Sequence, residues 1–539
     1  TWDHLVNSEV LYHLSYDGLP ARKGSPRRND RAFVLPPEWA ESADGRGALP
    51  TRSRPSQRTD TLSPRPRKTA VTMADADERE RVLATIRRRV TPDDAERAAM
   101  RDAVARLSDR IETEVSDLPV DADVVQVGST ARGTWLAGDR DIDLFVRFPP
   151  DLDRELLERY GLAVGNAVLP EGHEEYAEHP YVTGTFEGFD IDLVPCYDVD
   201  DAAAPQSAVD RTPHHNAYLG QRLDDGTAGE VRVFKQFLNG IGVYGSDLRT
   251  RGFSGYLAEL LVLEYGGFEP LLEAAAGWHP PVAFDPENHA TESHDDPLVM
   301  VDPTDPTRNV AAVCSAANVA RLQHYAREFL DDPRPDLFEP RDPDPVDAAA
   351  VRRHVERRGT APVAVVFDAP DIVDDQLYPQ LRKSLSGVRD ELDRRGFGPI
   401  RAATFADDRA VLFVELAHRR LPRIERHEGP PVHVREHAEG FYGAYTGESP
   451  DAEGDRDDGN GAAATYGPFV DGDRYVVERE RSFADAAAFL RSEDLFGVGL
   501  GARVETRLQE GYEVLVGPAV ADLCPEFGRA LADYFDPRP

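Results

Sequence analysis

Cysteine is scarce in this chain of 539 residues, and long apolar segments are missing. The three cysteines, Cys196, Cys314 and Cys524, are odd in number and far apart, which argues against a disulfide framework and a cysteine-based zinc site. No apolar run approaches the roughly 18 to 20 residues that span a bilayer, and no signal-peptide pattern is present. We therefore expect a cytoplasmic protein with no membrane partner.

Lysine is also rare, because it occurs only at Lys23, Lys68, Lys235 and Lys383 among 62 basic residues. The 98 acidic residues give a formal net charge of −36. A carboxylate-rich surface keeps a protein hydrated in concentrated salt, where the Debye length falls to about 3 Å. The composition therefore predicts a halophilic source, in which the acidic surface is an adaptation to salt rather than to a binding partner. An ordinary acidic protein is the alternative.

Residues 1–72 differ from the rest of the chain. They are rich in proline, serine and arginine, lack apolar periodicity, and carry 12 basic against 8 acidic residues. We expect a disordered extension, or upstream sequence joined by a misplaced start, since Met73 looks like the natural beginning of the acidic protein. A functional basic arm is the competing hypothesis.

The length predicts three or four domains, because 539 residues exceed what one core can serve. Thr91 and the following Pro92 predict the start of a helix, whose apolar stripe runs from Met100 to Val115. Strands are predicted at 124–127 and 141–146, and then as a hairpin of 181–186 with 189–194.

The remaining pattern is helical and then mixed. Helices are predicted over 231–238, 253–265 and 310–330, with a Pro/Asp-rich loop at 285–306. After a Pro/Asp-rich linker, the β-α-β-β order of 363–415 favours a small α+β sheet like those that bind RNA. An acidic, glycine-containing break at 451–461 precedes the final region.

The most informative motif is a turn of small residues followed by two aspartates. Residues 128–134 read Gly-Ser-Thr-Ala-Arg-Gly-Thr, and Asp141 and Asp143 follow. Gly128 allows close approach to a phosphate, and Ser129 offers a hydroxyl at a helix start with free N–H groups. Asp141 and Asp143 share one face of a strand, where carboxylate oxygens suit Mg²⁺. Alone, the turn could be only a helix cap; with the aspartates it predicts metal-assisted nucleotide transfer.

The second strand of the hairpin supplies a further carboxylate. Asp190 and Asp192 lie on the same face of that strand, so periodicity alone does not choose between them.

Six segments in order resemble the archaeal, class I CCA-adding tRNA nucleotidyltransferases of the DNA polymerase β-like superfamily. They are Gly-Ser-Thr-Ala-Arg-Gly-Thr-Trp-Leu (128–136), Ala-Glu-His-Pro-Tyr-Val (177–182), Asp-Leu-Val-Pro-Cys-Tyr (192–197), Ser-Ala-Val-Asp-Arg-Thr-Pro-His-His (207–215), Arg-Gly-Phe-Ser-Gly-Tyr-Leu (251–257) and Asp-Pro-Thr-Asp-Pro-Thr-Arg-Asn-Val (302–310). The resemblance implies a multidomain α+β protein. Its parts would be a nucleotidyltransferase head with a mixed sheet at 73–222, a helical neck at 223–335, and an RRM-like α+β body and tail at 336–539.

The resemblance also implies the metal ligands. They fall on Asp141, Asp143 and Asp192, which leaves Asp190 as a neighbour, and two Mg²⁺ ions are expected. The family often has glutamate at the first position, so Asp141 is a shorter carboxylate there.

Contacts to CTP or ATP are implied for Gly128 and for a further set of side chains. Those expected at the triphosphate and ribose are Ser129, Arg132, His215, Lys235 and Tyr244. Lys235 also draws attention by itself, because a lysine kept in an arginine-rich chain suggests a compact point charge. The alternatives are a solvated helix lysine for Lys235 and a hydrogen-bonded loop histidine for His215.

Base recognition is implied for Arg308, with Asn309 beside it, after a rigid Asp-Pro-Thr-Asp-Pro loop and before a helix. Without the resemblance, an arginine at a helix start is usually only solvated. For His179, a structural hydrogen bond and a nucleotide contact are equally weighted.

The expected macromolecular partner is tRNA, held by its acceptor and T arms and its 3′ end. A basic island at 418–427 is continued by His433, Arg435, His437, Phe441 and Tyr442, and is predicted to face phosphates. In strong salt the counterion-release contribution is small, so binding must rely on hydrogen bonds, shape and stacking. An ordinary charged loop is the alternative, and a homodimer is compatible with the family.

The predicted activity is template-independent addition of CCA to the tRNA 3′ end. The alternatives are a poly(A) polymerase, or an oligoadenylate or second-messenger synthase, on the same catalytic unit. A catalytically degenerate RNA-binding protein is a further alternative, against which the intact Asp141, Asp143 and Asp192 argue.

Overall fold

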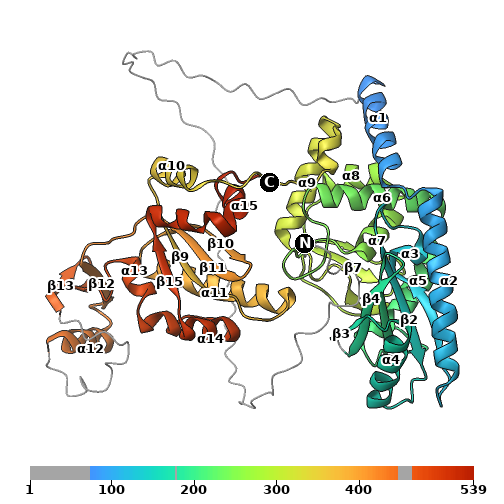
Figure 1. The fold of residues 1–539 in the computed structure, drawn as a ribbon. Helices are drawn as coiled ribbons and strands as arrows, with labels where there is room; N and C mark the ends of the chain where they lie inside the picture. Colours follow the sequence, from blue (N-terminus) through green and yellow to red (C-terminus); the bar gives the residue numbers. More distant parts are fainter. Residues whose placement is uncertain (1–72, 177–178, 447–463) are drawn as a thin grey trace, which may run out of the picture.

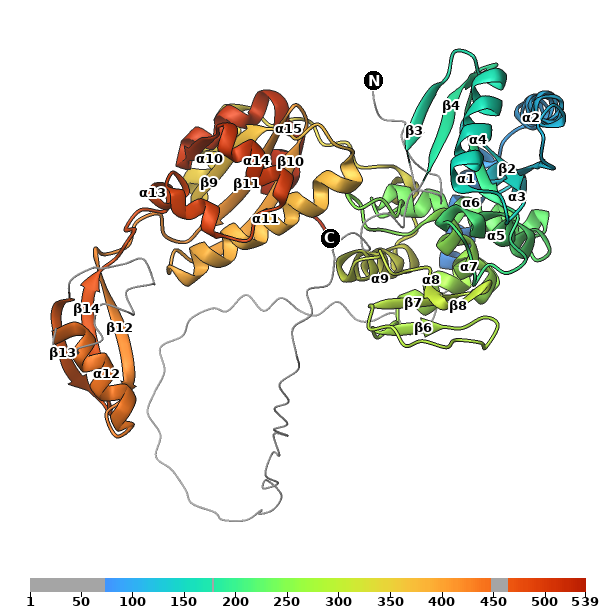
Figure 2. The ribbon, with the colours of Figure 1, turned by 90° about the horizontal axis from the view of Figure 1, so that it is seen from below.

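The computed structural model describes residues 73–176, 179–446 and 464–539. The expectations for residues 1–72 and for the break at 451–461 lie outside the described residues. Figures 1 and 2 show an elongated molecule, with a five-stranded sheet near one end and a small three-stranded module at the other.

The N-terminal part combines helices with a mixed sheet. Its elements are α1 (Met73–Val90), α2 (Asp94–Ser116), β1 (Asp123–Val127), α3 (Gly128–Arg132), β2 (Asp141–Phe148), α4 (Arg154–Val168), β3 (His173–Tyr176), β4 (Pro180–Phe186) and β5 (Phe189–Tyr197). The strand order is β1-β2-β5-β4-β3, and β2 and β5 are parallel while the other neighbours are antiparallel. The predicted mixed sheet with helices is confirmed.

The two faces of this sheet differ in character. Ile142, Leu144 and Ile191 are fully buried on one face, in a core shared with α2 and α4. The alternate positions of β2 and β5 lie on the other face, which is apolar at Phe145 and Val194 and polar where both strands begin. The site described below lies on this polar end.

The start of α2 corrects one prediction. The N-cap is Asp93, not Thr91: its side chain accepts a hydrogen bond from the Glu96 N–H, and the Glu96 side chain accepts one from the Asp93 N–H. The Thr91 hydroxyl instead donates to the Arg87 carbonyl at 2.6 Å, at the end of α1. A reciprocal capping box therefore replaces the single threonine cap.

The middle of the chain is mainly helical. Its elements are η2 (Ala208–Arg211), α5 (Thr212–Gly220), α6 (Asp225–Gly240), α7 (Gly255–Tyr265), α8 (Phe268–Ala275), β6 (Val282–Phe284), β7 (Leu298–Asp302), β8 (Asp305–Asn309), α9 (Ala316–Asp331) and η3 (Pro335–Phe338). Leu83 and Ile86 of α1 are buried in the same core as these helices. Thus α1 packs with the predicted neck, although it precedes the predicted boundary at 222.

Two predictions in this part are wrong. The expected loop at 285–306 contains β7 and the start of β8, which pair antiparallel. Pro306 is accommodated because β8 is an edge strand, where a missing N–H breaks no ladder. The expected helix at 310–330 begins only at Ala316, where the Ser315 side chain caps it by accepting from the Asn318 N–H.

The C-terminal part carries two sheets. Its elements are α10 (Ala348–Arg358), β9 (Ala361–Asp368), α11 (Asp374–Arg394), β10 (Pro399–Ala406), β11 (Arg409–Leu416), β12 (Ile424–Pro431), α12 (Arg435–Thr446), β13 (Ala464–Asp471), β14 (Arg474–Glu480), α13 (Ala486–Leu490), η4 (Glu493–Gly497), α14 (Ala502–Glu510), β15 (Glu513–Val516), η5 (Gly517–Leu523) and α15 (Cys524–Phe535). The larger sheet has the order β10-β11-β9-β15 and is antiparallel throughout. With α11 and α14 it follows the β-α-β-β-α-β pattern, in agreement with the predicted RRM-like body.

Both faces of this larger sheet are covered. One face packs against α11, α13 and α14, and the other against α10, η5 and α15. Figure 1 shows these helices on either side of β9 and β11. The module of β12, β14, β13 and α12 is inserted between β11 and α13 and lies apart from them. No helix in the described residues is long and apolar enough to cross a membrane.

Candidate functional site

Four aspartates form a compact block on the polar face of the N-terminal sheet. The parallel register places Asp141 opposite Asp190 and Asp143 opposite Asp192. On its other side, β5 pairs with β4 so that Thr183 stands opposite Asp192. Because register partners share a face, the structure brings together the three predicted carboxylates and leaves Asp190 at the exposed edge of the block.

This block accumulates negative charge. Burial raises the pKa of Asp192 to about 6, although a hydrogen bond from Thr183 opposes the shift. The neighbouring carboxylates, Glu175 first and then Asp141 and Asp190, raise that pKa further. Carboxylates that repel one another on a half-buried surface favour a divalent cation, which offsets the repulsion.

The glycine turn touches this block directly. Gly128 has φ +76°, and a Cβ built on it would lie 2.0 Å from Oδ2 of Asp143. Glycine is therefore required at position 128 for two reasons: the backbone angle, and the space that the Asp143 carboxylate occupies. The next residues form the short helix α3, in which the Ser129 carbonyl accepts a hydrogen bond from the Thr134 N–H at 3.0 Å.

The donor set fits a metal that is shared with a substrate. In residues 73–176, 179–446 and 464–539, no group of three or more His, Cys, Asp or Glu side chains is close enough to enclose a metal ion by itself. The aspartates instead lie side by side on an open sheet face. Mg²⁺ commonly uses one or two protein carboxylates and completes its octahedron with substrate phosphates and water.

Arg132 and Lys235 meet at one buried carboxylate. Nε and Nη2 of Arg132 lie 3.0 and 2.9 Å from Oε2 of Glu259. Nζ of Lys235 lies 3.2 Å from Oε1 of the same residue. Lys235 is only 2% exposed, so the alternative of a solvated helix lysine is wrong.

Tyr244 lies next to this pair. A Cβ built on Gly255 would be 3.3 Å from the Tyr244 hydroxyl and 3.5 Å from Nζ of Lys235. The two side chains therefore approach the same Cα at the start of α7. The structure thus groups Arg132, Lys235 and Tyr244 from three separate elements.

His215 and Arg308 meet at a second buried carboxylate, that of Asp302. Nε2 of His215 lies 2.8 Å and Nη1 of Arg308 lies 2.7 Å from Oδ2 of Asp302. Burial opposes ionisation, but His215 and Arg308 hold the pKa of Asp302 well below its usual range. The His215 ring also stacks on Tyr256, at 4.2 Å between centroids. His215 lies in helix α5 and not in a loop.

Arg308 and Asn309 end strand β8, rather than preceding a helix as predicted. The Asn309 oxygen accepts hydrogen bonds from the N–H groups of Met300 and Ala311, both at 2.9 Å. Its amide nitrogen donates to Asp296 and to the Leu298 carbonyl. Asn309 therefore holds the hairpin together, and no part of its amide is left for a nucleotide.

His179 is buried beside the sheet. Its Nε2 lies 3.3 Å from the Ser207 hydroxyl, which in turn donates to Asp210 at 2.9 Å. His179 therefore makes the structural hydrogen bond that was one of its two predicted roles.

Comparison with known proteins covers the chain in three consecutive pieces. Family models match for a nucleotidyltransferase domain at 108–215, for the second domain of tRNA nucleotidyltransferase at 229–339, and for the C-terminal domain of CCA-adding enzymes at 358–517. The CCA-adding enzyme of Haloarcula marismortui is 58% identical over 479 residues, which cover 86% of this chain and 100% of its own. The chain belongs to the CCA-adding enzyme family. It is a tRNA nucleotidyltransferase, and the predicted resemblance is confirmed.

Other CCA-adding enzymes are similarly close. That of Halobacterium salinarum is 61% identical over 460 residues, which cover 85% of this chain and 98% of its own. These relatives come from halophilic archaea, in agreement with the acidic, lysine-poor composition. Among solved structures, a cytoplasmic RNA terminal U-transferase matches 50% of this chain at 17% identity and a TM-score of 0.38, too low to carry an argument.

Several residues that organise the site were not singled out from the sequence. They are the carboxylates Asp210, Glu259, Asp302 and Asp305, and the ring of Tyr256. Asp302 and Asp305 each accept hydrogen bonds from the threonine two residues later, so the repeated Asp-Pro-Thr pattern was an available signal. For Glu259 the signal was one acidic residue within the buried stretch 256–262 of α7.

The basic island leads into β12, the first strand of the distal module (β12, α12, β13 and β14), and three of its arginines are paired within the chain. Arg419 and Arg420 both approach Asp485, and Arg426 pairs with Asp471. His427 stacks on Phe441, with centroids 5.6 Å apart. The island is therefore a surface of paired charges and aromatic rings rather than an unneutralised basic patch.

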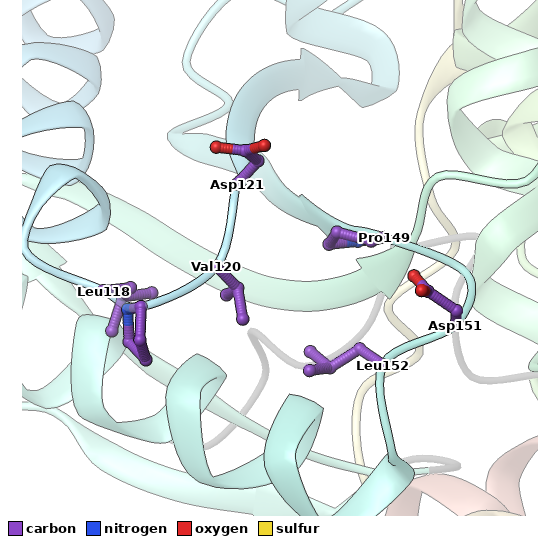
Figure 3. A pocket seen from close by; sticks show the side chains of 7 residues that line it. Leu118, Val120, Asp121, Pro149, Asp151 and Leu152 are labelled. Atoms are coloured by element: carbon purple, nitrogen blue, oxygen red, sulfur yellow. The ribbon is translucent and has the colours of Figure 1, made fainter.

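A shallow pocket of about 570 Å³ opens at the other end of the N-terminal sheet. Figure 3 shows its lining residues on the loops that precede β1 and follow β2. Gly128 and Asp141 stand at the opposite ends of the same two strands. This pocket is therefore separate from the aspartate block.

Proposed function

We propose that this chain rebuilds the 3′-terminal CCA of tRNA from CTP and ATP, without a nucleic-acid template, and releases pyrophosphate. The position of Asp143 carries the proposal: the register of β2 with β5 sets it beside Asp192, and the pairing of β2 with β1 sets it against the Gly128 turn.

Asp141, Asp143 and Asp192 would hold two Mg²⁺ ions on the open face of the sheet. Bound there, the metal would lower the pKa of the tRNA 3′-hydroxyl and neutralise the departing pyrophosphate. The raised pKa of Asp192 and the shared face support this assignment.

The protein's own task is to position the reactants. The 3′-hydroxyl releases its proton to solvent, its oxygen forms a bond to the α-phosphorus, and the bond from that phosphorus to the pyrophosphate oxygen breaks. No protein nucleophile is needed for this exchange, because positioning and charge stabilisation supply the catalysis. Arg132 and Lys235 would hold triphosphate oxygens, with the Ser129 hydroxyl at the start of α3.

The nucleoside part of the substrate would be bound by the residues around Asp302, together with Tyr244. His215 and Tyr244 would close around the triphosphate and ribose, and Arg308 would contact the incoming base together with the RNA end. The shared carboxylate of Asp302 supports a joint role for His215 and Arg308. We assign Asn309 to the support of Arg308, since its amide is fully used within the hairpin.

The acceptor and T arms of tRNA would be gripped by the C-terminal part, including the distal module. Paired arginines with His427 and Phe441 suit binding by hydrogen bonds and stacking, which persist in strong salt better than simple charge attraction. The cytoplasmic location and the homodimer stay predictions.

The test is the length of the product on a sequencing gel, with tRNA that lacks its CCA end. CTP alone should give two added residues, and CTP with ATP should give three. A long oligo(A) product from ATP alone would instead support a poly(A) polymerase or oligoadenylate synthase. Binding of tRNA without any incorporation would support a degenerate RNA-binding protein.

A further inference from the structure

Helix α7 buries a carboxylate inside an otherwise apolar segment. Glu259 is 0% exposed, and its neighbours Ala258 and Leu260 are buried as well. A buried carboxylate is costly unless charged or hydrogen-bonding partners compensate it, so its partners indicate why it is there.

Glu259 joins three elements that are distant in sequence. Oε2 accepts hydrogen bonds from Arg132 at the end of α3, and Oε1 lies 3.2 Å from Nζ of Lys235 on α6. The hydroxyl of Thr134, which follows α3, donates to Oε1. Both carboxylate oxygens are therefore occupied by groups next to the Gly128 turn.

The charge balance of this cluster is positive. Burial alone would raise the pKa of Glu259, but Arg132 and Lys235 lower it by more, so the group stays ionised. Arg232 adds a third buried cation, whose Nη1 donates to the Gly133 carbonyl. Arg132 and Lys235 share the single carboxylate of Glu259, so these three side chains together carry a net positive charge, which complements a triphosphate.

We propose that Glu259 is the positioning residue of the triphosphate site. It holds the side chains of Arg132 and Lys235 side by side, at the end of the helix that starts at Gly128. Two buried cations without this carboxylate would repel each other and lose their common orientation. The inference rests on the proposed function, in which Arg132 and Lys235 contact the triphosphate.

The test uses Glu259→Gln in the full chain, which keeps the size of the side chain but removes its charge. We expect KM for CTP and for ATP to rise about tenfold, with kcat within about threefold and KM for tRNA within about twofold. Binding of inorganic triphosphate, measured by titration calorimetry, should weaken by about the same factor.

A matched control is Glu415→Gln in the C-terminal sheet. Glu415 is also buried, at 1% exposure, and its oxygens lie 2.6 and 2.9 Å from Nε and Nη2 of Arg358. Its substitution should lower the melting temperature and leave the KM values for CTP and ATP unchanged. Equal KM changes in both variants would overturn the inference, since they would show only a general loss of stability.

A second variant covers the case in which Glu259→Gln does not fold. Thr134→Val removes the hydrogen bond that Thr134 donates to Glu259 and the one that it accepts from Lys235, but keeps every charge. It should raise KM for CTP about threefold with kcat unchanged. If Glu259→Gln folds and binds triphosphate as wild type does, the positioning role is refuted. If only Thr134→Val folds, unchanged triphosphate binding by that variant refutes it. Wild-type protein that adds no CCA would refute the proposed function instead, and the calorimetric comparison separates the two failures.

Discussion

The N-terminal and C-terminal sheets treat buried negative charge in opposite ways. In the C-terminal sheet, Glu415 is paired with Arg358, and these contacts lower the pKa of Glu415 against the effect of burial. In the N-terminal sheet, burial raises the pKa of Asp192, and its neighbouring carboxylates add to that shift. The C-terminal sheet compensates its buried charge within the chain and is covered on both faces. The N-terminal sheet keeps an open acidic face for a cation and a substrate.

The largest effect is predicted for a variant that removes one carboxylate from the acidic face. Asp143→Ala should lower incorporation of labelled CTP and ATP into tRNA lacking CCA by at least about a thousandfold, because a metal ligand is lost. Affinity for tRNA should survive. Glu415→Gln is the control and should keep kcat within about threefold; normal turnover by Asp143→Ala would remove the metal assignment.

A smaller effect distinguishes two aspartates on one strand. Asp192→Asn should lower kcat by at least about a hundredfold, whereas Asp190→Asn should lower it by no more than about tenfold. The physical reason is that Asp192 lies half-buried beside the half-buried Asp143, whereas Asp190 is exposed at the strand end opposite Asp141. Steady-state kinetics on both variants measures the difference, and a reversed order would exchange their roles.

The pH dependence of stability should have opposite signs for the two sheets. Folded Asp192 binds its proton more tightly than the unfolded chain does, so its contribution to the unfolding free energy falls as pH rises from about 4 to about 6. Glu415 has a lowered pKa, so its contribution is present above the usual carboxyl pKa and is lost as pH falls. Denaturant titrations in EDTA, compared between wild type and Asp192→Asn, isolate the first slope; parallel curves would contradict it.

The smallest effect on activity concerns the covered face of the C-terminal sheet. Phe405 and Phe413 are buried there, with centroids 5.9 Å apart, and are not exposed for stacking with bases as in open RNA-binding sheets. Phe405→Leu should lower the melting temperature but change KM for tRNA by less than about twofold. A large loss of tRNA affinity at a temperature where the variant is folded would show that this face opens to RNA.

The sequence predicted what depends on local pattern. The aspartates of β2 and β5 and the hairpin of β4 with β5 follow from alternation and turn residues, and the structure places Asp143 and Asp192 side by side. The N-cap of α2 differed from the predicted Thr91, because Asp93 and Glu96 form a reciprocal capping box instead.

Partners that are distant in sequence could not be predicted. Arg132 and Glu259 are 127 residues apart, and His215 and Asp302 are 87 apart, and no periodicity in either segment encodes these contacts. The β7–β8 hairpin was missed for a related reason, since prolines that indicate a loop are tolerated at a sheet edge.

The most direct test of the account is divalent-metal binding to the acidic face. Titration of Mn²⁺ in the presence of CTP, followed by electron paramagnetic resonance, should show tight binding to wild type. Binding should be at least about tenfold weaker for Asp143→Asn and unchanged for Glu415→Gln. Equal Mn²⁺ affinity in all three proteins would contradict the assignment of Asp141, Asp143 and Asp192 as the metal ligands.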